Sequence, residues 1–132
     1  MNSFEARIVS IERESNLHVV GFEVGKTTLW MMGLELPNVN IGDRVRLGFK
    51  STSVTVAVNA PKRISFSNRI DAKIEAITHG KLLSSMLLHT DNGMLEAIMT
   101  NRAFELLEVN EGSDVTVFIK ASEIAIREVI DD

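Results

Sequence analysis

The chain has 132 residues, which is enough for one ordinary domain or two very small ones. Its 45% hydrophobic and 24% charged residues are typical of a globular protein, and the absence of cysteine excludes disulfides, thiolate metal sites and cysteine nucleophiles. A net charge of −4 argues against broad binding to a phosphate backbone, because that mode needs a basic surface. Without a long apolar run or a secretory signal, we expect a cytoplasmic protein that has no membrane contact.

An internal repeat organises the sequence. Residues 4–11 match residues 70–77 in their order of apolar, acidic, alanine, basic and isoleucine positions, and residues 42–50 match residues 112–120. The second match is offset by four more positions than the first, so the second copy carries an insertion. We predict a first repeat over 1–60, a linker over 61–67 and a second repeat over 68–132. Each copy alone would be marginally stable.

Strands with one buried face are predicted where apolar and polar residues alternate, as they do over residues 4–8 and 115–119. Val24-Gly25-Lys26 and Asp91-Asn92-Gly93 have the chemistry of hairpin tips. Gly25-Lys26-Thr27 is not interpreted as a phosphate-binding loop, because the upstream glycine and the following helix of that motif are missing.

The turns before later strands are predicted at Ile41-Gly42-Asp43 and Glu111-Gly112-Ser113. A short helix is predicted over residues 100–107, capped by Thr100 or Asn101, with a shorter counterpart at residues 34–37 that ends at Pro37. Five short strands and one short helix per repeat predict an all-β fold of two tandem five-stranded barrels of the oligonucleotide/oligosaccharide-binding (OB) type.

Two function classes are disfavoured by the residues present. His18, His79 and His89 have no metal-ligand spacing, and no nucleophile-elbow sequence is found, so we expect neither a metal centre nor an enzyme. Binding of single-stranded nucleic acid needs aromatic residues interleaved with cations. Aromatic residues are only 5% of the chain, with Trp30 as its one tryptophan, so a nucleic-acid partner is disfavoured.

A lysine followed by small and hydroxyl-bearing residues closes a predicted strand in each repeat. These are Lys50-Ser51-Thr52, the first-repeat motif, and Lys120-Ala121-Ser122, the second-repeat motif. Hydroxyls and backbone N–H groups give directional hydrogen bonds, and one lysine offsets part of a ligand's charge. Such a cluster suits a small tetrahedral dianion. A solvated lysine at a strand end is the alternative interpretation of each motif.

The second repeat resembles the molybdate-binding Mop or TOBE domain, and the whole chain is similar to the duplicated form in molbindins. The resemblance rests on residues 68–74, 97–101, 110–115 and 117–124, of which the last is the most specific, and on a weaker match of the first repeat. It implies an OB-like barrel that holds molybdate or tungstate, needs no organic cofactor and assembles as a homo-oligomer with its sites between subunits. The implied ligand residues are Asn68, Thr100, Lys120, Ala121 and Ser122, with Lys50, Ser51 and Thr52 as first-repeat equivalents.

The opening motif departs from the family pattern of serine, a small residue, arginine and asparagine. Here Ser65-Phe66-Ser67-Asn68 puts Ser67 in place of the arginine, and Ala103 replaces a frequent serine. Ser67 is retained as a candidate ligand. Loss of the arginine removes a charge-assisted donor worth roughly 1.5 to 3 kcal/mol. The alternative function is therefore a duplicated barrel that has lost its anion sites and serves as a protein-interaction or regulatory module.

Overall fold

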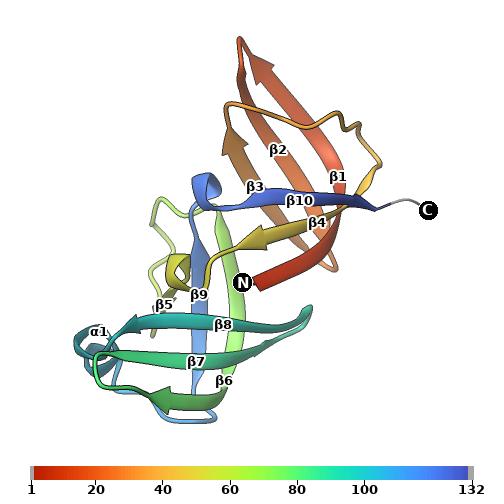
Figure 1. The fold of residues 1–132 in the computed structure, drawn as a ribbon. Helices are drawn as coiled ribbons and strands as arrows, with labels where there is room; N and C mark the ends of the chain where they lie inside the picture. Colours follow the sequence, from red (N-terminus) through yellow and green to blue (C-terminus); the bar gives the residue numbers. More distant parts are fainter. Residues whose placement is uncertain (1, 131–132) are drawn as a thin grey trace.

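The computed structural model describes residues 2–130 as two five-stranded antiparallel sheets, which lie one above the other in Figure 1. The upper sheet has the order β10-β4-β1-β2-β3 and the lower sheet the order β5-β9-β6-β7-β8. The prediction of an all-β fold with five strands per unit is confirmed. The strands of the upper sheet are β1 (Asn2–Glu14), β2 (Leu17–Val24), β3 (Thr27–Gly33), β4 (Arg44–Phe49) and β10 (Ala125–Ile130). Those of the lower sheet are β5 (Thr55–Ala57), β6 (Asn68–His79), β7 (Leu83–Thr90), β8 (Gly93–Thr100) and β9 (Asp114–Ile119).

The core lies on the apolar face of strands in which buried and exposed residues alternate. In both β1 and β6 the first eight residues are alternately buried and exposed, as a strand with one apolar face requires. The two repeats also share an irregularity in strand pairing. The register shifts just after the buried Ile8 in β1 and just after the buried Ile74 in β6. Buried side chains from the two sheets form one connected apolar cluster. Neither repeat therefore has a core independent of the other.

The predicted turns lie where the sequence placed them. Gly25 and Lys26 connect β2 to β3, and Asp91 and Asn92 connect β7 to β8. Gly25 has a φ of 59°, a left-handed conformation that glycine adopts without steric cost. The interpretation of this segment as a hairpin tip is confirmed.

The helix prediction is confirmed in the second repeat and wrong in the first. Helix α1 (Asn101–Leu107) begins at Thr100, whose hydroxyl accepts a hydrogen bond of 3.1 Å from the N–H of Ala103. Residues 34–37 form no helix, so the expectation of one helix per repeat is not met. The first repeat lacks the four inserted residues, which amount to about one helical turn, and Pro37 cannot donate a helical hydrogen bond. Among residues 2–130, no helix has the length and apolar character that a membrane span requires.

The fifth strands are exchanged between the repeats. After β4 the chain passes through the single-turn 3₁₀ helix η1 (Ser51–Ser53) into the lower sheet, where β5 pairs with β9. After β9 it passes through η2 (Ala121–Glu123) into the upper sheet, where β10 pairs with β4. Both crossings are visible at the junction of the sheets in Figure 1. The crossing segments η1 and η2 each begin directly after the lysine of one motif, and they meet through a 3.1 Å hydrogen bond from Ser53 Oγ to Glu123 Oε2.

Two asparagines link the sheets by the same contact. Asn68 at the start of β6 accepts from the N–H of Trp30 at 2.6 Å and donates to its carbonyl at 2.8 Å. Asn2 at the start of β1 accepts from the N–H of Glu96 at 2.7 Å and donates to its carbonyl at 2.8 Å. Trp30 and Glu96 lie on β3 and β8, the edge strands of the two sheets. Each asparagine thereby pairs part of an edge that would otherwise be open.

Candidate functional site

The second-repeat motif lines a cavity of about 300 Å³. Lys120 follows β9, and Ala121 and Ser122 begin η2, where the chain turns toward the upper sheet. Hydroxyl groups from the linker and an apolar side chain from β3 complete the walls. The lining residues are Met32, Ser65, Ser67, Lys120, Ala121 and Ser122. Four of the residues proposed from the sequence therefore share one cavity: Ser67, Lys120, Ala121 and Ser122.

The linker is held against the second repeat by aromatic packing. Phe66 packs on Phe118 of β9 with ring centroids 5.0 Å apart, and Phe118 is fully buried although it lies outside the main core cluster. Ser65 and Ser67, on either side of Phe66, both line the cavity. The phenylalanine that departs from the family pattern therefore lies between two cavity-lining serines and packs this part of the linker against β9.

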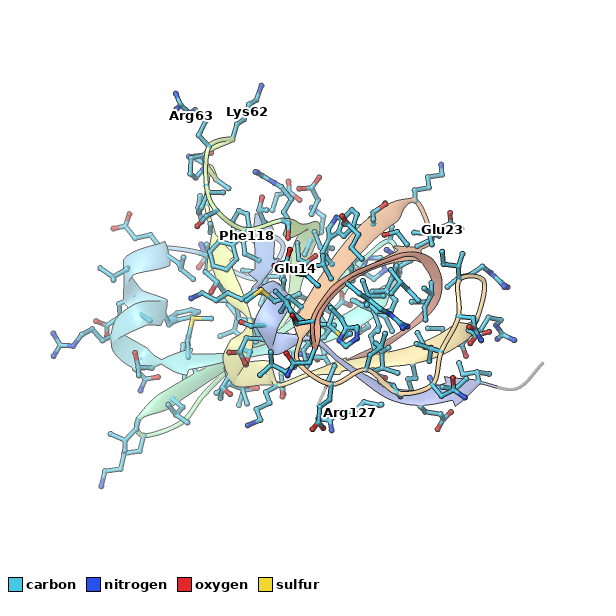
Figure 2. All side chains as sticks on the ribbon, turned by 90° about the horizontal axis from the view of Figure 1, so that it is seen from above. Glu14, Glu23, Lys62, Arg63, Phe118 and Arg127 are labelled. Carbon is cyan, nitrogen blue, oxygen red and sulfur yellow. The ribbon has the colours of Figure 1, made fainter. Side chains whose placement is uncertain are left out.

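Arg69 anchors the same segment from its other end. Its guanidinium lies 5.1 Å from the centre of the Phe118 ring, and its Nη1 donates to the carbonyl oxygen of Pro61 at 3.2 Å. Between these anchors, Lys62 and Arg63 lie at the tip of a loop that projects from the molecule (Figure 2). The arginine next to the opening motif is therefore used to fasten the linker.

The polar groups of the cavity are available to a ligand. Within residues 2–130, the ammonium of Lys120 and the hydroxyls of Ser65, Ser67 and Ser122 have no hydrogen-bond or ion-pair partner. The cavity of about 300 Å³ has room for a small anion. One cation and three hydroxyl donors around such a space form an environment for a small anion that accepts several hydrogen bonds.

Two residues proposed from the sequence lie elsewhere. Asn68 is fully buried, and its side-chain amide is already paired with the backbone of Trp30. Thr100 ends β8, an edge strand that packs against η1 of the other motif, and its hydroxyl caps α1. Both residues serve to hold secondary structure in place, and neither lines the cavity at the second-repeat motif.

The first-repeat motif has a different environment. Ser51 is buried, and its hydroxyl donates to Glu96 Oε1 at 2.9 Å. Lys50 and Thr52 are exposed beside it. A carboxylate within hydrogen-bond distance of the motif opposes the approach of an anion. The two motifs, similar in sequence, are therefore electrostatically unlike.

A larger cavity of about 430 Å³ lies next to Asp71, Ala72 and Asp114. Asp114 forms an ion pair of 2.9 Å with Lys73. The carboxylates in this wall make it unsuitable for an anion. Within residues 2–130, no group of three or more histidine, aspartate or glutamate side chains could hold a metal ion.

Ser65 and Met32 line the cavity but were not selected from the sequence. Ser65 lies two positions before Ser67, but both residues are at bends of the linker, so the sequence carried no periodic signal that the two serines share the cavity. Met32 comes from β3 of the first repeat and carried no such signal, because its position depends on the packing of β3 against η2.

Comparison with known proteins identifies a matching domain family and a similar fold. Residues 64–126 match the model of the TOBE domain. The fold is similar to that of the cytoplasmic molybdate-binding protein ModG, crystallised with molybdate bound: the TM-score is 0.87 and the identity 18%, over 94% of this chain and 93% of the other. A match of this extent covers both repeats, so the tandem OB-like architecture expected from the sequence is confirmed. No curated protein matches this chain.

Proposed function

We propose, from the match of residues 64–126 to the TOBE domain, that the protein is a non-catalytic, cytoplasmic binding protein for molybdate or tungstate. It would serve in storage, homeostasis or sensing of molybdenum. One observation carries the proposal: the cavity at the second-repeat motif combines one lysine with three hydroxyls, and none of these groups has a partner among residues 2–130. The similarity in fold to ModG, a cytoplasmic molybdate-binding protein, supports the choice of anion.

Each lining residue has a distinct part in the proposed site. Lys120 offsets part of the charge of the dianion, and Ser65, Ser67 and Ser122 donate hydrogen bonds to its oxygens. The small side chain of Ala121 lets the anion approach the backbone. A tetrahedral anion with four acceptor oxygens matches hydroxyl donors that converge from the linker and from η2. These groups bind a ligand without breaking a covalent bond in it.

We also propose that the protein acts as a homo-oligomer. Met32, which lines the cavity from β3, has 48% of its surface exposed, and Leu34 just beyond it has 62% exposed. A second copy of the chain packed on this side would cover these apolar side chains and close the cavity. Binding of the anion would then stabilise the assembled form.

The function is tested by calorimetric titration of the full chain with molybdate, tungstate and sulfate. We expect molybdate and tungstate to bind, sulfate to bind more weakly, and Lys120→Ala to lower the molybdate affinity about tenfold or more, because a charge-assisted contact contributes roughly 1.5 to 3 kcal/mol. Lys81→Ala, at an exposed lysine in the β6–β7 turn, is the matched control and should bind as the unmodified chain does. Absence of heat with molybdate and tungstate, or equal effects of the two alanine variants, would contradict the proposal.

A further inference from the structure

Glu96 holds, at the first-repeat motif, the position that Trp30 holds at the second-repeat motif. The same spacing along the chain separates Asn2 from Asn68 and Trp30 from Glu96. The structure shows the equivalence directly, since Asn68 pairs with the backbone of Trp30 as Asn2 pairs with that of Glu96. Accordingly η2 packs against β3, and η1 packs against β8. Each motif therefore faces the edge strand of the opposite sheet.

The side chains at the two equivalent positions differ in charge. The carboxylate of Glu96 accepts a hydrogen bond of 2.9 Å from Ser51 in the first-repeat motif. At the second-repeat motif the corresponding residues are Trp30, which has no charge, and Ala121, which has no hydroxyl. The Trp30 ring lies against Gly21 on β2, so close that a Cβ at Gly21 would come within 2.9 Å of it. Among the residues that the structure describes, no acidic side chain lines the cavity beside Lys120.

We propose that Glu96 is a built-in occupant of the first-repeat motif, and that it confines oxyanion binding to the second-repeat motif. The hydroxyl of Ser51, which would donate to a bound anion, donates instead to a carboxylate of the same chain. The inference rests on the proposed function and adds to it the residue that determines how many sites each chain offers. The inference follows from a difference between the two repeats, because Glu96 occupies the position that Trp30 has in the other repeat.

The charge of the Glu96 carboxylate opposes the binding of a dianion at the first-repeat motif. Two anions that share one hydroxyl donor lie within about 6 Å of each other. Repulsion between a carboxylate and a dianion at that separation weakens binding about a hundredfold or more, even with the screening that prevails near a protein surface. Removal of the carboxylate frees Ser51 and leaves Lys50 and Thr52 in place. The first-repeat motif then has the same kind of donors as its counterpart.

The Glu96 side chain can be removed without breaking the link between the sheets. Asn2 pairs with the backbone N–H and carbonyl of Glu96, and these remain in Glu96→Ala. Melting temperature and circular dichroism of each variant would verify that the fold is kept. Glu105→Ala is the matched control, because Glu105 is an exposed glutamate on α1.

The test is a series of substitutions analysed by equilibrium dialysis against molybdate. Lys120→Ala should lower the affinity at least about tenfold. Adding Glu96→Ala to Lys120→Ala should restore binding by at least about tenfold, and adding Lys50→Ala to that pair should remove it again. Glu105→Ala in place of Glu96→Ala should restore nothing.

Trp30 provides an independent readout of which motif is filled. It lies on β3, which packs against η2, and it is the one tryptophan of the chain. Molybdate should therefore change the tryptophan fluorescence of the unmodified chain, whereas binding restored by Glu96→Ala should leave it unchanged. A restored fluorescence response would mean that the second-repeat motif is still the one occupied, and would overturn the inference.

Other outcomes of this series also test the role of Glu96. Residual binding in Lys120→Ala that disappears with Lys50→Ala would show that the first-repeat motif is open despite Glu96, and would overturn the inference. Failure of Glu96→Ala to restore binding would do the same. If the unmodified chain binds neither molybdate nor tungstate, the proposed function fails. A Lys50-dependent gain in the single variant Glu96→Ala would then still support the role of Glu96, and no gain would reject it.

Discussion

Ser67 lies in the cavity wall next to the second-repeat motif, at the position where the family pattern has arginine. We predict that Ser67→Arg raises the molybdate affinity about ten- to a hundredfold, since it adds one charge-assisted donor of roughly 1.5 to 3 kcal/mol. Calorimetry on this variant and on Ser67→Gln measures the effect. Glutamine adds length without charge, so an equal gain from both variants, or no gain from arginine, would refute the prediction.

Asn68 belongs to the same opening motif but has a structural role. Its amide pairs with both backbone groups of Trp30, so Asn68→Ala should lower the free energy of unfolding by about 2 to 4 kcal/mol, through two backbone groups left without a partner. Urea denaturation in the absence of anion measures this loss. Asn2→Ala is the matched variant, and a smaller loss is expected there because Asn2 is 8% exposed and Asn68 is fully buried. Unchanged stability with weakened molybdate binding would instead identify Asn68 as a ligand.

These residues show what could be inferred without coordinates. Lys120, Ala121 and Ser122 were identifiable because the repeat places two similar strings at equivalent strand ends. The role of Asn68 was not, because an amide that pairs with the backbone of a distant edge strand leaves no local pattern. The opposite character of the two motifs depends on Glu96, a residue more than forty positions from Ser51.

At the scale of elements, the hairpins and α1 were predictable because short-range chemistry determines them. Glycine turns connect neighbouring strands, and Thr100 caps the helix from its own sequence vicinity. The exchange of β5 and β10 was not predictable, because either fifth strand could have paired within its own repeat. Residues 51–53 and 121–123 direct the chain across to the other sheet, and only their three-dimensional course reveals the exchange.

Removal of β10 tests the importance of that exchange. A chain that ends at Ile124 would leave the outer edge of β4 unpaired and would expose part of the core beneath it. We predict that it aggregates or fails to show a cooperative thermal transition, as measured by circular dichroism and light scattering. A chain that ends at Ile130, with β10 intact, is the control. Native-like melting of the shorter chain would mean that β10 contributes little to the upper sheet.

At the scale of the molecule, the two repeats form one structural unit around an approximate twofold relation. The shared core, the paired asparagines and the bond between Ser53 and Glu123 all cross between the repeats. The lysine motifs lie on the two crossing segments, so the part of the chain that joins the sheets also presents the candidate ligand groups. The repeat in the sequence indicated this duplication, and the difference between the copies at Glu96 and Trp30 is the basis for the proposed confinement of the anion to one motif.

The exchanged strands also bear on how the protein is made in the cell. The upper sheet, built mainly from the first half of the chain, lacks its last member until β10 has been synthesised. Domains usually fold from the N-terminus as they leave the ribosome, but here completion of the first sheet waits until residues 125–130 have been synthesised. Pairing between β4 and β10 joins segments far apart in sequence, which slows folding. A nascent chain would therefore expose the unpaired edge of β4 to chaperones until β10 has left the ribosome.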